Sequence, residues 1–114
     1  MKTSKARILY GLLFLAVGAL PTLAEDKHNM SNGSKEIHEI MVDAVKKNQS
    51  MEMSGDTDKD FAMTMADHHR SGIKMAKAEV ENGKNAELKA VAQKIVDAQQ
   101  KELTTLDKHA AMSH

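Results

Sequence analysis

The sequence predicts an all-α protein: a hairpin of two long helices with one shorter helix. Apolar residues recur at the 3–4-residue spacing of a helix in three successive segments. No segment alternates between polar and apolar residues, and the single proline, Pro21, lies ahead of all three segments. Three helices bury only a modest core. We therefore expect either that the three helices are stable alone or that a second copy of the chain completes the bundle.

The N-terminal residues have the layout of a secretory signal peptide. Lys2, Lys5 and Arg7 precede the apolar run Ile8–Leu20, and the segment closes at Ala24. The run is shorter than the ~20 residues of a spanning helix. We therefore expect cleavage after Ala24, a periplasmic or secreted protein, and no stable membrane anchor afterwards. A retained N-terminal anchor is the alternative.

Polar and turn-forming residues divide the remaining chain. Residues 25–33 are expected to form a flexible tail, and Ser34 to cap a first helix that ends near Gln49. A linker over 50–58 carries three further capping candidates, Asp56, Thr57 and Asp58. The second helix is expected from about Lys59 to Asn82, and the third from the cap Asn85 to about Ala111. The resulting organisation is a signal peptide over 1–24, a tail, short helix and linker over 25–55, and a helical metal-binding hairpin over 56–114.

Composition excludes several classes of function. The chain contains no cysteine, so thiolate metal sites, disulfides and a cysteine nucleophile are absent. Loss of residues 1–24 would remove three basic residues, leaving 13 basic and 16 acidic side chains and a net charge of −3. This balance argues against a nucleic-acid partner. No serine triad or phosphate-binding glycine loop is present, and we expect a protein that is not an enzyme.

Two polar clusters interrupt the apolar stripes of the long helices. On the second helix, Met65, His68 and Met75 fall within reach of one point, with His69 on the shoulder of the stripe and Met63 directed toward solvent. Gly72 leaves room for another helix or a bound ion to approach closely. On the third helix, Gln99 and Glu102 interrupt the stripe, and antiparallel packing would set them opposite Met65 and His68. The predicted apolar stripes are Phe61, Met65, Gly72 and Ala76, and Leu88, Ala92, Ile95, Leu103 and Leu106.

Methionine and histidine also recur in short pairs, which suggests soft-metal binding. The chain has nine Met and six His. Thioether sulfur selects Cu(I), or the similar Ag(I), and imidazole accepts both Cu(I) and Cu(II). Side chains three residues apart on a helix can chelate one ion. The auxiliary ligand candidates are His28, Met30, His38, Met41, Met51, Met53, Met63, His109, Met112 and His114.

Residues 58–76, DKDFAMTMADHHRSGIKMA, resemble the signature of the family called domain of unknown function 305. The matching positions are Asp58, Phe61, Met65, His68, His69, Ile73, Met75, Ala76, Gln99 and Glu102. Gly72 departs from the alanine usual in the family, a small-for-small change. The resemblance covers roughly residues 56–108. It implies a ferritin-like helical fold, export and metal handling, with copper foremost, but it does not assign the ligands.

We therefore expect a periplasmic copper-binding protein that buffers or transfers Cu(I), and that contributes to copper homeostasis or tolerance. The expected ligands are Met65, His68 and Met75, with His69, Gln99 and Glu102 as further or supporting groups. A homodimer and a copper exporter or periplasmic copper acceptor are the expected protein partners. Two alternatives remain: a ferritin-like metal oxidase with a carboxylate-bridged metal pair, and a helical stress or binding module in which His68, His69 and Glu102 only tie helices together.

Overall fold

The computed structural model describes residues 30–112, and these residues form an all-α structure, as predicted. Its helices are α1 (Asn32–Ser50), α2 (Thr57–Asn82) and α3 (Ala86–Ala111), and residues 30–112 contain no strand. The proposed signal peptide, His28 and His114 lie outside the described residues. The linker and the turn at Gly83 fall where the sequence predicts them.

Each helix begins at a side-chain cap. Ser31 Oγ accepts a hydrogen bond from Ser34 N, Asp56 Oδ1 from Lys59 N, and Asn85 Oδ1 from Leu88 N. The expectation that Ser34 caps the first helix was wrong, because Ser31 supplies the cap one turn earlier. Gly33, expected in a flexible tail, is instead a buried residue of α1, where it lies against Asn82 of α2.

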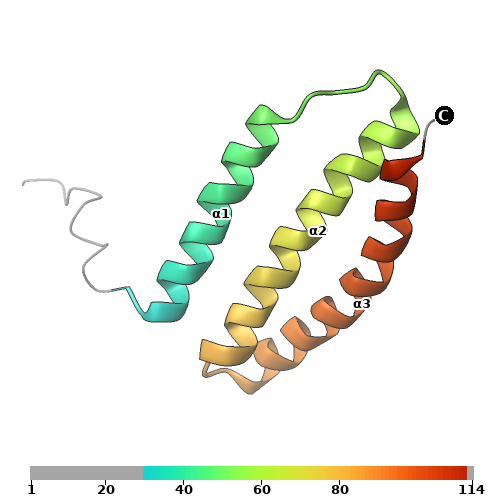
Figure 1. The fold of residues 1–114 in the computed structure, drawn as a ribbon. Helices are drawn as coiled ribbons and strands as arrows, with labels where there is room; N and C mark the ends of the chain where they lie inside the picture. Colours follow the sequence, from blue (N-terminus) through green and yellow to red (C-terminus); the bar gives the residue numbers. More distant parts are fainter. Residues whose placement is uncertain (1–29, 113–114) are drawn as a thin grey trace, which may run out of the picture.

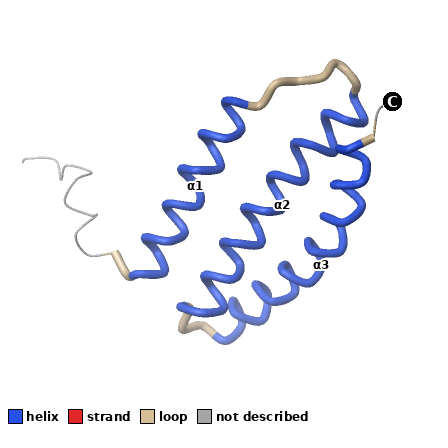
Figure 2. Tube along the Cα trace, viewed as in Figure 1, coloured by secondary structure: helices blue, strands red, loops and turns tan. Residues whose placement is uncertain are grey.

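The helices lie side by side in one layer, with α2 in the middle (Figure 1). α2 packs against α3 on one side and α1 on the other, and α1 and α3 make no contact. The tube view shows how differently the helices are joined: an extended linker leads from α1 to α2, and a tight turn from α2 to α3 (Figure 2). The long helices thus form the predicted antiparallel hairpin, and α1 lies against its α2 edge.

The core between α2 and α3 consists of small and β-branched residues. Ile73, Ala76, Ala92 and Val96 form the buried cluster, and Val80 and Leu103 pack against it. Several residues predicted to lie inside are exposed instead. In a single layer, a helix is covered only where a neighbouring helix packs beside it, and its two outer faces stay open to solvent. These exposed residues are Phe61, Leu88 and Ile95 of the predicted stripes.

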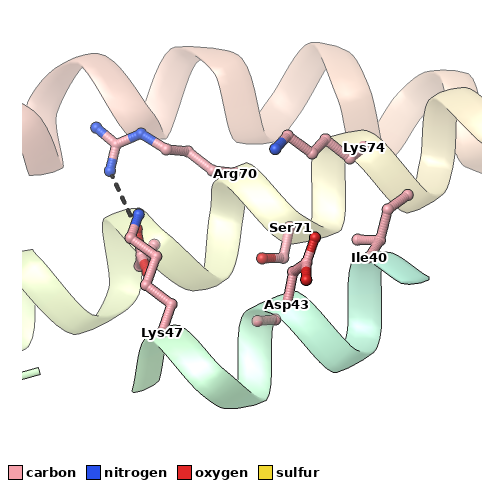
Figure 3. Close-up of a pocket in the computed structure, with 8 residues that line it drawn as sticks. Ile40, Asp43, Lys47, Arg70, Ser71 and Lys74 are labelled. Carbon is pink, nitrogen blue, oxygen red and sulfur yellow. Dashed lines mark hydrogen bonds and ion pairs between the residues drawn. The ribbon is translucent and has the colours of Figure 1, made fainter. Parts of the chain in front are cut away.

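Ion pairs join the three helices on one face of the layer. The buried carboxylate of Asp67 on α2 pairs with Lys47 of α1, and its Oδ1 lies 3.6 Å from Arg70 Nη1. Arg70 also pairs with Asp107 of α3. Figure 3 shows Lys47, Arg70 and Lys74 around the cleft between α1 and α2. The network therefore fixes the order of the helices across the layer.

Candidate metal centre

The central feature of the hairpin is a buried histidine joined to a carboxylate on the facing helix. His69 Nε2 of α2 lies 2.6 Å from Glu102 Oε2 of α3. The imidazole is buried, whereas the side chain of Glu102 is mostly exposed. Of the two adjacent histidines, the sequence favoured His68 as the inward one. This was wrong, because His69 faces α3 and His68 lies exposed one position round the helix.

The second ring nitrogen of His69 has no hydrogen-bond partner among the described residues. Nδ1 is buried and unsatisfied, a costly condition for a polar atom. When Nε2–H donates to Glu102, the neutral ring keeps a lone pair on Nδ1. Metal-binding histidines have the same arrangement, in which a carboxylate holds one nitrogen and the other is left to ligate.

A recess beside this pair brings a thioether close to it. Met65, Phe61, Thr105 and Leu106 line the recess together with His69 and Glu102. Met65 and His69 are one turn apart on the same helix, which directs the two side chains toward a common region. The recess therefore combines a soft sulfur, an imidazole and a carboxylate within mainly apolar surroundings.

A second recess continues along the same groove. It contains His68, Met75 and Gln99, together with apolar residues of both helices. The six predicted ligands are thus divided between two adjoining recesses, Met65, His69 and Glu102 in one and His68, Met75 and Gln99 in the other. Glu102 lies opposite the first half of α2, as predicted, whereas Gln99 lies against Gly72, just past the middle of the helix.

Gly72 does not leave free space between these recesses. A Cβ at position 72 would lie 2.5 Å from Gln99 Oε1, so the amide of Gln99 fills the space that the glycine provides. Gln99 Oε1 is also buried with no hydrogen-bond partner among the described residues. The expected close approach of another helix is therefore seen as the Gln99 side chain of α3, and this side chain, not an ion, fills the space.

The auxiliary candidates are dispersed over the layer. Met51 and Met63 line a recess beside Asp107, and Thr64 Oγ1 lies 3.6 Å from Met51 Sδ. Met63 is half-buried there, so its predicted orientation toward solvent was wrong. Met53 and Met112 are exposed, His38 and Met41 are exposed on α1, Met30 precedes α1, and His109 lies in the last turn of α3. Within residues 30–112, no three or more His, Asp or Glu side chains cluster to hold a metal.

Sequence reasoning missed the ionic network on the opposite face. In that network Arg70 pairs with Asp67 and Asp107. Asp67, Ser71, Lys74 and Ala78 recur every three or four residues, and this second row could have revealed that α2 has helices on two sides.

Comparison with protein families identifies one match over most of the chain. Residues 5–110 match the family described as a domain of unknown function (DUF305). The chain belongs to this family. The DUF305 match includes α1 and the linker, a longer stretch than the 56–108 expected from the hairpin motifs.

Neither the curated proteins nor the solved structures gave a match to this DUF305 chain. No helix among residues 30–112 combines the length and the apolar character needed to cross a membrane.

Proposed function

We propose that this DUF305 protein binds copper, with Cu(I) preferred, and buffers or transfers it along the groove between α2 and α3. The observation that carries the proposal is the buried Nδ1 of His69, which has no partner among the described residues while Nε2 is held by Glu102. An unsatisfied nitrogen in a buried position is costly, and coordination of a metal would remove that cost.

The neighbouring side chains favour a soft ion. Met65 offers a neutral thioether in the same recess as His69, and thioethers select Cu(I) and the similar Ag(I) over harder divalent ions. Glu102 would have two effects. Its carboxylate would hold the imidazole in one orientation and offset the positive charge of the ion.

The second recess would provide a place to pass the ion on. His68 and Met75 both line it, and His68 is exposed. A metal exchanging one ligand at a time could move from the buried His69 to these more accessible groups. Cu(II) would be taken by imidazole-rich sets, whereas Ag(I) would follow the sulfur ligands.

The proposed setting is an exported compartment, entered through the signal peptide and served by a copper exporter or a periplasmic copper acceptor. In that compartment a free thiol would be oxidised. The absence of cysteine and the abundance of methionine agree with binding by sulfur that forms no disulfide.

The proposal is tested by titrating the protein with Cu(I), without oxygen, against a coloured chelator. We expect Met65→Leu and His69→Gln each to weaken the tightest binding step at least tenfold. Glu102→Gln is expected to weaken it about 10- to 100-fold, because the amide holds the imidazole less firmly. Glu81→Gln on the exposed surface of α2 is the matched control and should leave the affinity unchanged.

Thermal unfolding separates metal binding from a purely structural tie. If His69 and Glu102 only join the helices, Glu102→Gln will lower the melting temperature and leave the Cu(I) affinity as it was. That result would contradict the proposal. Ligand binding should also raise the melting temperature, because it stabilises the folded state. The stabilisation is about 2.7 kcal/mol when the free ligand concentration is a hundred times Kd.

A further inference from the structure

The helix layer has two chemically different faces. The ionic network lies on one face, where Asp43, Lys47, Asp67, Arg70 and Lys74 line the cleft between α1 and α2. The other face carries the α2–α3 groove and is largely apolar. Its large side chains remain open to solvent, with exposed fractions of 58% for Phe61, 56% for Leu88, 46% for Val91 and 38% for Ile95.

α1 extends the apolar face. Ile37 lines a recess with Glu79 of α2, and Glu79 also lines the α2–α3 groove. Met41 follows Ile37 by one turn, and Val45 follows Met41 by another; both are more than half exposed. The apolar face therefore spans all three helices, and we use the term for these residues and those of the groove.

A single layer of helices buries few large apolar side chains. No side chain among residues 30–112 is both large and fully buried, and most of the buried apolar residues are alanines. Helices reach a stable arrangement when their apolar sides are covered by a second layer. The exposed side chains of the apolar face are those that such a layer would bury.

The size of the face corresponds to an ordinary protein interface. α2 and α3 have 26 residues each, which gives helices about 39 Å long and a pair about 20 Å wide. The area is therefore about 800 Å², which is the surface that each partner contributes to a standard stable interface.

We propose that a second copy of this chain covers the apolar face. A face that pairs with itself must be self-complementary. The recesses of the groove contain the carboxylates of Glu79 and Glu102 and the imidazole of His68, but no Lys or Arg among the described residues that line them. Because Glu102 is paired with His69 of its own copy, the carboxylate of Glu79 is the acceptor and the imidazole of His68 is the group that can donate to it, in apolar surroundings. The two copies would form a double layer, with both ionic networks outside.

The arrangement would bring His68 and Met75 of both copies into one interface, because both residues line the covered groove. Only this consequence for metal binding rests on the proposed function. The dimer itself depends on the apolar face alone, so it is measured on the metal-free protein.

Sedimentation velocity of the metal-free full chain tests the proposal. We expect a dimer, and we expect Val91→Lys and Ile95→Lys to shift it to a monomer with the same helical circular dichroism. Gln93→Lys is the matched control, because Gln93 is exposed on the opposite side of α3 and a lysine can still reach its partner Asp97. The control should remain a dimer.

Methionine oxidation by peroxide gives a second readout on the intact fold. The measured quantity is the oxidation rate of Met75 divided by that of Met53 in the linker. This ratio should be lower in the wild-type protein than in Val91→Lys. If Val91→Lys or Ile95→Lys fails to fold, the other of these two variants and the oxidation rates still show whether the apolar face forms the dimer. A wild-type monomer, with the apolar face covered by residues 1–29 or left for another protein, would overturn the proposal. Dimerisation unaffected by Val91→Lys and Ile95→Lys would overturn it too, as would a monomeric Gln93→Lys.

Discussion

The side chain of Gln99 packs closely against Gly72 in the candidate site. The glycine on α2 makes space for a glutamine amide from α3, and that amide oxygen is buried with no hydrogen-bond partner among the described residues. A glycine within a helix costs about 1 kcal/mol relative to alanine. The local sequence is therefore less stable than it could be, and Gln99 occupies the space that results.

A double-mutant cycle measures this coupling. In the wild-type background, Gly72→Ala pushes against Gln99, and the gain in helix propensity is offset by displacement of the amide. In a Gln99→Ala background the space is free, so Gly72→Ala should raise the free energy of unfolding by about 1 kcal/mol. We expect a coupling of about 0.5–1 kcal/mol from urea denaturation, and additive effects would contradict the contact.

Sequence patterns predict the residue types of the site better than its geometry. Met65, Glu102 and Gln99 were expected near one another; Met65 and Glu102 line one recess, whereas Gln99 lines the other. Which of two adjacent histidines points inward depends on a 100° difference around one helix. That difference is decided by the side on which α3 packs, and the apolar stripe alone does not give this information because much of it is exposed.

At the scale of the elements, the start of α2 is organised around one carboxylate. Asp60 accepts hydrogen bonds from Ser54 Oγ and Ser54 N, both at 2.7 Å, and from Gly55 N at 3.1 Å. The first of these, from the Ser54 hydroxyl, contributes most to holding the pKa of Asp60 below its usual value of 3.8. The carboxylate thereby ties the linker to the helix, and Gly55, with φ of 88°, makes the turn.

The hydrogen bonds that Asp60 accepts from Ser54 and Gly55 should stabilise the protein in a pH-dependent way. Because the pKa of Asp60 is lowered in the folded state, its contribution is complete above pH 3.8 and disappears as the pH falls through the lowered folded value. Asp60→Asn should therefore reduce stability at neutral pH and have a smaller effect in acid. Urea denaturation across this range measures the difference. Glu52→Gln, an exposed change in the same linker, should show no such trend, and a pH-independent effect of Asp60→Asn would refute the tie.

Helix boundaries were predictable where a local signal exists. Asn82, Gly83 and Asn85 mark the turn between the long helices, and both ends lie where these residues indicate. The cap of α1 was missed by three residues, because Gly33 is a poor helix former and lies against Asn82 in a different helix. Tertiary packing, which no local window contains, extends α1 to Asn32.

At the scale of the whole molecule, α1 is joined to α2 by polar side-chain contacts as well as by packing. Its connections to α2 include the ion pair of Lys47 with the buried Asp67 and the hydrogen bond from Asn82 Nδ2 to Glu36 Oε2 at 3.4 Å. Removal of Lys47 leaves a buried carboxylate with Arg70 alone, at 3.6 Å. Lys47 therefore contributes to the attachment of α1.

Lys47→Met should loosen α1 while the hairpin persists. We expect a loss of about 1 kcal/mol in the free energy of unfolding, since the partly exposed lysine is not fully desolvated. Amide hydrogen exchange should accelerate in α1 more than in α2 and α3. Lys46→Met is the control at the neighbouring exposed position and should change stability by less than about 0.5 kcal/mol. Equal acceleration in all three helices would contradict the expectation.

The single-layer arrangement was not predictable from periodicity. An apolar stripe shows that a side of a helix prefers to be buried, but it does not show whether the cover comes from this chain or from another. Phe61, Leu88 and Ile95 have the spacing of core residues, and in the chain by itself they lie on an open face. The fold class follows from local spacing, whereas the number of layers is set by packing that local spacing does not encode.

The tight turn between α2 and α3 also has a consequence for the order in which the structure forms. Two helices joined at Gly83–Asn85 can add contacts in sequence from the turn outward, and each new contact closes a loop only slightly longer than the last. Chains dominated by such local contacts fold rapidly. The contact between His69 and Glu102, separated by 33 residues, lies about halfway along the hairpin and would form midway through this process. The histidine would therefore receive its orientation only after the half of the hairpin nearer the turn is in place.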